Sequence, residues 1–301
     1  MIEPRPGVYT VVPTPFTVDE GLDEGSFERL LGELVARGVD GVIVLGVLGE
    51  APKLHGDERD RVVRAAARAV GAAASVIVGA SHASAVGTRA LIDRAAALGA
   101  DGVMVSPPRI ARSDAGSVRD YMRLALSAAP CPVLLQDHPA SSGTLMSAST
   151  IVAIAEECPS VRWVKVEDPP SARKVLELRA AAGDRLLLLG GLGALSLLDE
   201  LDAGSDGTMT GFAAPEALVA IVGHHRRGDR ARAAQEFGRW LPLVVAESAE
   251  EIGLSVRKWI YYRRGWIDTP ACRTPSFPVP ETVRTRVDEQ LRELGLLERE
   301  G

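Results

Sequence analysis

Short apolar runs alternate with amphipathic segments over the first three quarters of the chain. The runs lie near residues 7–13, 41–45, 75–79, 102–106, 132–136, 160–166, 185–189 and 205–210. Segments with helical periodicity lie between them, for example 26–38, 57–74, 86–99 and 118–129. Runs that are apolar throughout indicate parallel strands buried on both faces. Eight strand–helix units in about 220 residues predict a (β/α)8 TIM barrel. A doubly wound open sheet is the alternative, but no glycine fingerprint follows the first run.

One phrase recurs where a predicted helix leads into a predicted strand. It reads RGVDG at 37–41, LGADG at 98–102 and AGSDG at 203–207. A Gly just past a helix can adopt the left-handed conformation that ends it, and the following Asp-Gly leads into the strand. The phrase therefore predicts the same helix-to-strand joint three times.

The pattern changes near residue 228, after which only helical segments follow, at 231–248, 253–266 and 281–300. A Pro-rich stretch, 269–281, separates the last two. We expect residues 1–227 to form the barrel with the active site, and residues 228–301 to form a C-terminal three-helix bundle packed on it.

Composition excludes several classes of protein. The chain is 46% apolar with a net charge of −6, which argues against disorder and against a nucleic-acid partner. The basic run at 224–230 is interrupted by Gly and Asp and is interpreted as a helix end and turn. Three dispersed cysteines indicate reduced thiols and offer no zinc site. No membrane span and no signal peptide are expected, so the predicted location is cytoplasmic.

Lysine is scarce, with four Lys among 34 basic residues. Lys165 lies near the end of the sixth predicted strand, and period-2 alternation turns it to the same face as Trp163 and Glu167. Burial inside a barrel disfavours the ammonium form, and a free amine can attack a carbonyl to form a Schiff base. The alternative is a Lys that reaches solvent or pairs with Glu167. Surface or ion-pair positions are expected for the other three, Lys53, Lys174 and Lys258.

Polar groups at other predicted strand ends could join this site, because barrel active sites form at the carboxyl ends of strands. The segment from Gly46 to Glu50 could present backbone N–H groups to a carboxylate, and Glu50 could act as an acid or base or bind neighbouring N–H groups. The fifth strand ends in Gln136, Asp137 and His138, with Gln136 expected to face inward. His138 suits proton transfer near neutral pH, and His82 after the third strand is a weaker candidate.

Several of these motifs together resemble the dihydrodipicolinate synthase and N-acetylneuraminate lyase family. The resemblance covers nearly the whole chain in order and rests on GVYT at 7–10 with TPF at 14–16, G-x-x-G-E at 46–50, DER at 57–59, the run from Gly99 to Pro108, Lys165 and the phrase at 204–207. It implies a (β/α)8 barrel, a homotetramer or dimer of dimers, and a Schiff base between Lys165 and a 2-keto acid such as pyruvate. It also implies that the 46–50 segment holds the carboxylate, with Gly190 and Met209 among the substrate-binding positions, and it implies no cofactor and no metal.

The departures from that family concern proton transfer. Val47 and Leu48 replace the usual hydroxyl-bearing pair, and Gln136 stands where the family has its proton-shuttling Tyr. Ser141 replaces an Arg that the synthases use for a second carboxylate, Pro108-Arg109 replaces their Tyr pair, and Lys165-Val166-Glu167 replaces the usual Lys-Glu. These changes argue against lysine-pathway synthase activity. Protons would have to move through Glu167, His138, Asp137 or water.

Three classes of function follow from these observations. The first is a class I lyase in which Lys165 condenses with a 2-keto acid and the iminium supports aldol chemistry with an aldehyde, or loss of water as in a 2-keto-3-deoxy sugar acid dehydratase. The second is a repurposed binding protein for a small carboxylic acid. The third, a hydrolase using His138 with Asp137, is disfavoured because neighbouring strand residues point to opposite faces.

Overall fold

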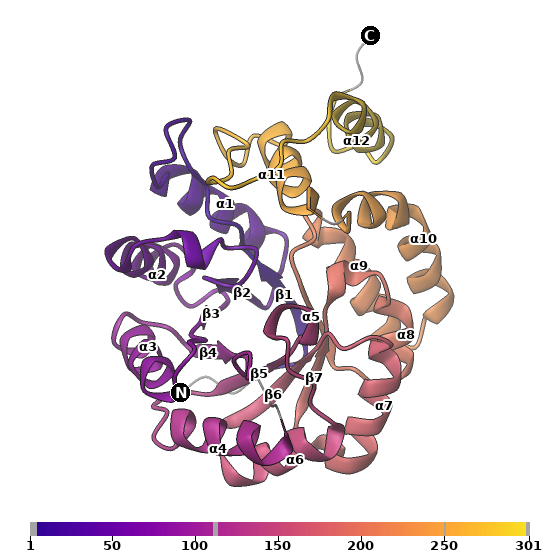
Figure 1. Cartoon of the computed structure of the whole chain (residues 1–301). Coiled ribbons are helices and arrows are strands. Elements are labelled where there is room, and N and C mark those ends of the chain that lie inside the picture. The colour runs from indigo at the N-terminus through magenta and orange to yellow at the C-terminus, as the bar shows by residue number, and fades with distance from the viewer. Residues whose placement is uncertain (1–4, 111–113, 250, 299–301) are drawn as a thin grey trace.

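Eight parallel strands close into a barrel in which β1 pairs with both β2 and β8. This computed structural model describes residues 5–110, 114–249 and 251–298. Helices surround the strands, and the short helix α5 lies in the middle of the ring (Figure 1). The predicted fold class, a (β/α)8 barrel followed by helices, is confirmed. The first four residues of the N-terminal stretch and the last two of the expected final helix lie outside the described residues.

Every predicted apolar run contains one strand, to within one residue at the carboxyl ends of β5 and β7. The strands are β1 Gly7–Val11, β2 Gly41–Val44, β3 Ser75–Gly79, β4 Gly102–Val105, β5 Val133–Asp137, β6 Val161–Val166, β7 Leu187–Gly190 and β8 Gly207–Thr210. The helices are α1 Glu24–Ala36, α2 Gly56–Val70, α3 Ala85–Ala97, α4 Ala115–Leu126, α5 Pro139–Ser142, α6 Ala148–Glu157, α7 Ser171–Ala182, α8 Leu197–Asp202, α9 Pro215–Arg226, α10 Arg230–Glu247, α11 Gly253–Arg263 and α12 Glu281–Glu293.

Alternation along the strands divides the apolar residues between two cores. The larger core lies between the strands and the surrounding helices. The smaller one fills the barrel interior with Tyr9, Val11, Ile43, Ile77, Met104, Leu134, Trp163, Leu189 and Met209. Tyr9 and Trp163 meet there edge to face, with ring centroids 5.3 Å apart. Because side chains fill the interior, space for a ligand is expected at the mouth of the barrel.

The three repeated phrases form the predicted joints. Gly38, Gly99 and Gly204 have φ of +79°, +98° and +95°, which glycine adopts readily. The Asp of each phrase then binds the strand that comes before it in the sequence. The carboxylates of Asp40, Asp101 and Asp206 accept hydrogen bonds from the N–H groups of Val8, Val76 and Leu188, respectively, each 2.8 Å long. In return, the backbone N–H of each Asp donates to the backbone carbonyl of the strand residue whose N–H it accepts. These reciprocal bonds, here called the aspartate clamps, join neighbouring strands near their amino ends.

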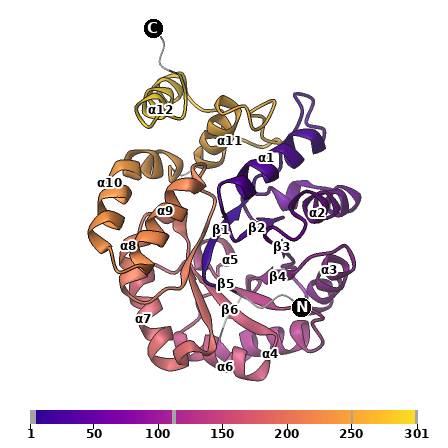
Figure 2. The ribbon, with the colours of Figure 1, turned by 180° about the vertical axis from the view of Figure 1, so that it is seen from behind.

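The tail helices α10, α11 and α12 extend from α9 along one side of the molecule, with α11 beside α1 and α12 outermost (Figures 1 and 2). The chain between α11 and α12 returns to the barrel, where Thr269 donates to the carbonyl of Phe16 at 2.8 Å. The tail therefore contacts the loops at the mouth of the barrel. Within the described ranges, no helix combines the length and the hydropathy needed to cross a lipid bilayer.

Candidate active site

A cavity of about 720 Å³ opens at the carboxyl ends of strands β2 to β5. Among the catalytic and substrate-binding positions expected from the sequence, five line it, namely Gly46, Val47, Glu50, Gln136 and Ser141, and so does the weaker candidate His82. Leu48, His138, Lys165 and Glu167 are not among its lining residues. Its wall also includes Ser81 and Ser106 from the neighbouring strand ends, Arg59 and Arg109, and Leu254 of the tail helix α11. The cavity therefore lies where barrel enzymes have their active sites.

Lys165 and Glu167 meet at 3.0 Å between Nζ and Oε1, both almost completely buried. They lie two residues apart and turn to the same face of the chain, as the alternation predicted. Lys165 is the register partner of Gln136 on β5. The Nε2 group of Gln136 donates to Glu167 Oε2 at 2.7 Å, and Ser106 Oγ donates to Gln136 Oε1 at 2.8 Å. A continuous polar chain thus joins the cavity wall at Ser106 to the Lys165 amine.

The groups around Glu167 favour its charged form. Burial alone raises the pKa of Glu167, but Lys165, His138 and the hydrogen bond from Gln136 more than offset burial, so its pKa lies below the ordinary value. The backbone N–H of Leu192 adds a longer contact at 3.4 Å. Glu167 is therefore an ionised carboxylate in direct contact with an amine.

His138 and Asp137 lie on different sides of the barrel wall. His138 Nδ1 lies 4.0 Å from Glu167 Oε2 and 2.8 Å from Ser141 Oγ. Burial lowers the pKa of His138 and outweighs the nearby Glu167, which raises it, so the ring is mainly neutral at pH 7. Asp137 is fully buried and instead pairs with Lys174 of α7, with Oδ2 and Nζ 3.3 Å apart. The two side chains point apart, as expected, which leaves the hydrolase hypothesis without its base-orienting pair.

The turn from Leu45 to Glu50 is backbone-strained, since Leu45 and Glu50 have φ of +57° and +53°. A Cβ at Gly79 would lie 2.1 Å from the carbonyl oxygen of Leu45, so glycine is required beside the turn. The N–H groups of Gly49 and Glu50 are bonded within the turn. In the described part of the chain, no hydrogen bond uses the N–H groups of Val47 and Leu48. Those two groups can therefore receive a ligand. The Leu48 side chain packs on the barrel interior.

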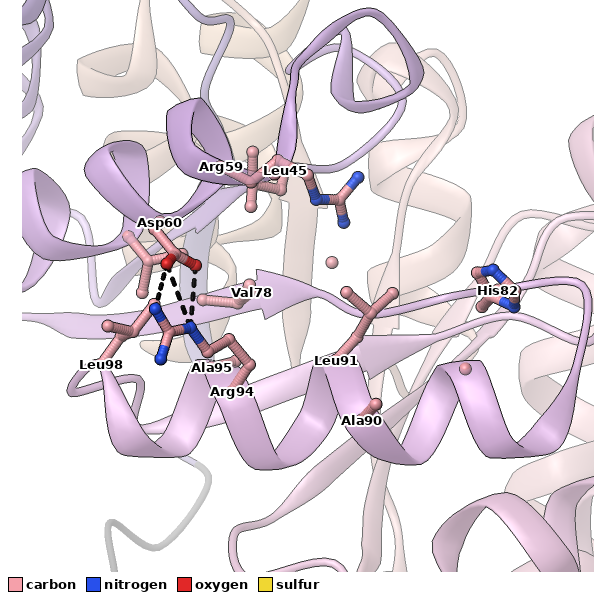
Figure 3. Close-up of a pocket in the computed structure, with 14 residues that line it drawn as sticks. Leu45, Arg59, Asp60, Val78, His82, Ala90, Leu91, Arg94, Ala95 and Leu98 are labelled. Carbon is pink, nitrogen blue, oxygen red and sulfur yellow. Dashed lines mark hydrogen bonds and ion pairs between the residues drawn. The ribbon is translucent and has the colours of Figure 1, made fainter.

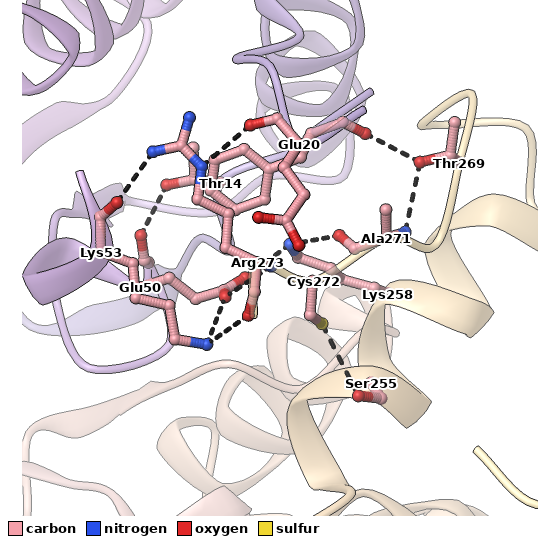
Figure 4. Close-up of polar contacts among 12 residues, drawn as sticks. Thr14, Glu20, Glu50, Lys53, Ser255, Lys258, Thr269, Ala271, Cys272 and Arg273 are labelled. Carbon is pink, nitrogen blue, oxygen red and sulfur yellow. Dashed lines mark hydrogen bonds and ion pairs between the residues drawn. The ribbon is translucent and has the colours of Figure 1, made fainter. Parts of the chain in front are cut away.

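Glu50 is enclosed by basic groups (Figure 4). Its Oε1 accepts from Lys258 Nζ at 2.7 Å, and its Oε2 accepts from Lys53 Nζ at 2.9 Å and from the Arg273 N–H at 3.1 Å. Sequence reasoning offered an acid–base role or bonding to nearby backbone N–H groups. In the structure the partners are mainly ammonium groups, one of which comes from the tail.

Of the two positions expected for the remaining lysines, surface or ion pair, the structure shows the ion pair for all three, while two of them are not at the surface. Lys258 is fully buried, and Lys174 is 7% exposed. Both are ion-paired, Lys258 with Glu50 and Lys174 with Asp168 at 2.9 Å. These carboxylates offset the cost of burying an ammonium. Glu50 is distant from Lys258 in the sequence, whereas Asp168 lies six residues before Lys174. Lys53 is partly exposed and paired with Glu50, as expected.

Gly190 and Met209 do not line the described cavity. Met209 is fully buried in the barrel interior, and a Cβ at Gly190 would lie 1.7 Å from Glu200 Oε2, outside the barrel. Sequence reasoning missed Ser106 and Glu200. Ser106 could have been found from its position at a strand end. Glu200 lies on a helix, and no local pattern distinguishes it.

A second cavity of about 550 Å³ lies outside the barrel between α2 and α3 (Figure 3). Its wall is mostly apolar, and the ion pair between Arg94 Nε and Asp60 Oδ1, 3.0 Å long, bridges the two helices beside it. Leu45, Gly79, Arg59 and His82 border both cavities. His82 also stabilises its own loop by accepting the Ser84 N–H at 3.1 Å.

The comparisons with known proteins agree with this geometry. The sequence model of the dihydrodipicolinate synthetase family matches residues 5–294. An L-2-keto-3-deoxyarabonate dehydratase of Azospirillum brasilense is 33% identical over 279 residues, which cover 91% of this chain and 89% of that protein. A 4-hydroxy-tetrahydrodipicolinate synthase of Salinibacter ruber is 30% identical over 290 residues, covering 93% of each. Among solved structures, a dihydrodipicolinate synthase from Rhodopseudomonas palustris has a TM-score of 0.92 at 34% identity, covering 97% of this chain and 99% of that one.

A closed parallel barrel with a cavity at its carboxyl end and relatives of this kind define a barrel enzyme of the lyase class. More narrowly, the chain belongs to the dihydrodipicolinate synthetase family.

Proposed function

We propose that the protein is a Schiff-base lyase that removes water from a 2-keto-3-deoxy sugar acid. The observation that carries the proposal is the contact between the Lys165 amine and the Glu167 carboxylate, 3.0 Å apart and connected to the cavity wall through Gln136. The similarity to an L-2-keto-3-deoxyarabonate dehydratase supports dehydration as the reaction.

The first step uses Glu167 to free the amine. Glu167 takes a proton from the Lys165 ammonium, and the neutral nitrogen attacks C2 of the keto acid. The C–N bond forms, the C2 oxygen leaves as water, and an iminium results. The substrate carboxylate is received by the N–H groups of Val47 and Leu48, whose side chains contribute no hydroxyl.

The iminium then acts as an electron sink. Glu167 removes a proton from C3, and the electron pair moves through C2 to nitrogen, giving an enamine. The pair returns as the C4 hydroxyl leaves, protonated, as water, and a conjugated iminium forms. Hydrolysis consumes one water, restores Lys165 and releases a 3,4-unsaturated 2-keto acid. The net change is the loss of one water molecule.

Glu167 is the group that transfers protons in this scheme, because Gln136 replaces the phenol of related enzymes and cannot transfer a proton. Gln136 instead fixes the carboxylate through Nε2, and Ser106 fixes the orientation of the Gln136 amide. Neutral His138, beside Glu167, can accept a proton from it between steps.

Cleavage of the C3–C4 bond is the second candidate reaction. It uses the same iminium, and the synthase relatives at about the same identity favour carbon–carbon chemistry. It differs in its product, an aldehyde rather than water.

The test is borohydride trapping with pyruvate, read by intact mass and peptide mapping. One adduct is expected at Lys165, and none in Lys165→Ala or in Lys165→Arg, which keeps the charge but cannot form the Schiff base. With only four lysines in the chain, mapping assigns the adduct without ambiguity. Five- and six-carbon 2-keto-3-deoxy acids then distinguish dehydration from aldehyde release. Absence of any adduct with several 2-keto acids would contradict the proposal.

A further inference from the structure

Glu50 connects the turn beside the cavity to the tail of the chain. Its two carboxylate oxygens are bound by Lys258 of α11, by Lys53, and by the backbone of Arg273. Glu50 and Lys258 are 3% and 0% exposed, so solvent screens this ion pair little. The two residues are separated by 208 positions in the sequence.

The groups that hold Glu50 are themselves fixed by the tail (Figure 4). Lys258 Nζ also donates to the carbonyl of Ala271 at 2.7 Å and lies 4.4 Å from the centre of the Phe16 ring. Lys53 Nζ donates to the carbonyls of Arg273 and Pro275 at 2.7 and 2.8 Å. The stretch after α11 therefore fixes both ammonium groups in one geometry.

The Arg273 side chain strengthens the same connection. Its guanidinium forms two bonds with Glu58 near the start of α2, one of them 2.7 Å long from Nη1 to Oε2. The guanidinium also lies over the Phe16 ring, with Cζ 4.4 Å from the ring centre. On the opposite side of the turn, Thr14 Oγ1 donates to the carbonyl of Gly49 at 2.7 Å. The turn is thus held from the loop after β1, from α2 and from the tail.

The held turn is a strained one. Leu45 and Glu50, at its two ends, both have positive φ, and between them lie the N–H groups of Val47 and Leu48. A conformation of this kind persists only when its surroundings determine it. Without the charge on Glu50 or on Lys258, the end of the turn loses its anchor and the two N–H groups lose their common direction.

We propose that Glu50 and Lys258 are positioning residues that aim the Val47 and Leu48 N–H groups at the substrate carboxylate, which makes the tail helix α11 part of the active site. The inference rests on the proposed function, in which that carboxylate is bound at this turn. Leu254, from the first turn of α11, already borders the same cavity.

The test compares a ligand that has a carboxylate with one that lacks it. Pyruvate and hydroxyacetone both offer a ketone to Lys165, but hydroxyacetone has no carboxylate. In Glu50→Gln and in Lys258→Met, the pyruvate concentration for half-maximal borohydride trapping is expected to rise about tenfold or more, since small misplacements of binding groups cost that much. The maximal trapping rate, and trapping by hydroxyacetone, should stay within about twofold of the wild type.

Two further variants keep the test decisive. The double variant Glu50→Gln/Lys258→Met removes both charges, which avoids an uncompensated buried charge if a single variant fails to fold. It should show the same selective loss for pyruvate. The matched control is Glu216→Gln. It breaks the ion pair between Glu216 of α9 and Arg264 at the end of α11, whose Oε1 and Nη2 atoms lie 2.5 Å apart. It should leave pyruvate trapping unchanged.

A purely structural network would lower the melting temperature and leave the half-maximal pyruvate concentration unchanged, which overturns the inference. Equal losses for pyruvate and hydroxyacetone overturn it as well. If the wild type forms no adduct at all, the proposed function fails. The positioning role is then judged by calorimetric titration with pyruvate, whose affinity must fall by the same factor in Glu50→Gln but not in Glu216→Gln.

Discussion

Among single residues, Glu167 contacts the groups that the proposed proton transfers involve. It touches the amine of Lys165, the amide of Gln136 and the N–H of Leu192, and His138 lies nearby. Gln136 donates a hydrogen bond but cannot pass on a proton as the Tyr of related enzymes does. In the proposed chemistry, proton transfer therefore depends on Glu167. Because that carboxylate has a lowered pKa, it remains a base at a pH where an ordinary Glu is half protonated.

Replacing Glu167 by Gln should lower turnover of a 2-keto-3-deoxy acid at least about 100-fold, the usual contribution of a general acid–base group. Borohydride trapping of pyruvate at Lys165 should persist at a reduced rate, since the amine remains. Steady-state kinetics and intact mass measure the two effects. Ser117→Ala, on the exposed start of α4, is the control. Undiminished turnover in Glu167→Gln would assign proton transfer to another group.

Glu200 is a buried carboxyl group with a different role. Burial raises its pKa to about 7, with Ser171 opposing and Glu167 adding to the rise. The folded protein therefore holds a proton that the unfolded chain releases near pH 4.5, so stability falls as pH rises between these two values and is level above them.

The variant Glu200→Gln cannot titrate, and its oxygen can still accept from Ser171 Oγ, which bonds Glu200 Oε1 at 2.6 Å. It should match the wild type near pH 4 and exceed it in unfolding free energy by about 3 kcal/mol at pH 8, from the size of the shift. Urea unfolding at several pH values measures this. A difference that does not vary with pH would show that Glu200 does not titrate in this range.

Among the elements, the helix-to-strand joints were predictable because their signal is local. A Gly with positive φ is followed two residues later by an Asp, and the strand that comes next is an apolar run. The site was predictable only in part. Alternation placed Lys165, Glu167 and Gln136 inward, but the pairing of Glu50 with Lys258 depends on where α11 packs, which no local pattern encodes. Buried positions for Lys174 and Lys258 were missed for the same reason.

Removing one aspartate clamp should affect stability and not chemistry. Asp101→Ala leaves the buried Val76 N–H without its side-chain acceptor, and the expected loss is about 1–3 kcal/mol of unfolding free energy. Urea unfolding with an unchanged slope would confirm this. Asp184→Ala is the control, because its side chain is fully exposed. Loss of pyruvate trapping in folded Asp101→Ala would contradict the separation of the two ends of the barrel.

For the whole molecule, the proposed function has a ligand joined to Lys165 of β6 while the turn at Val47 and Leu48 binds its carboxylate. Pyruvate at about 100 times its dissociation constant should stabilise the folded chain by about 2.7 kcal/mol, which for this length raises the melting temperature by about 4 °C. Scanning calorimetry measures the shift.

The same scan distinguishes an enzyme from a binding protein. If catalysis requires the Schiff base, Lys165→Ala should lose all turnover and most of the thermal shift. A variant that keeps the full shift would indicate that the barrel recognises the carboxylate without condensing with the ketone.

The aspartate clamps lie near the amino ends of the strands, whereas Val47, Leu48, Gln136 and Ser141 follow the carboxyl ends. Evolution could therefore exchange the Tyr, the hydroxyl-bearing pair and the Arg of related enzymes without altering the aspartate clamps. The same arrangement suits directed evolution. A library randomised at these four positions should yield mostly folded variants, so that screening for new 2-keto acid substrates samples chemistry rather than foldability.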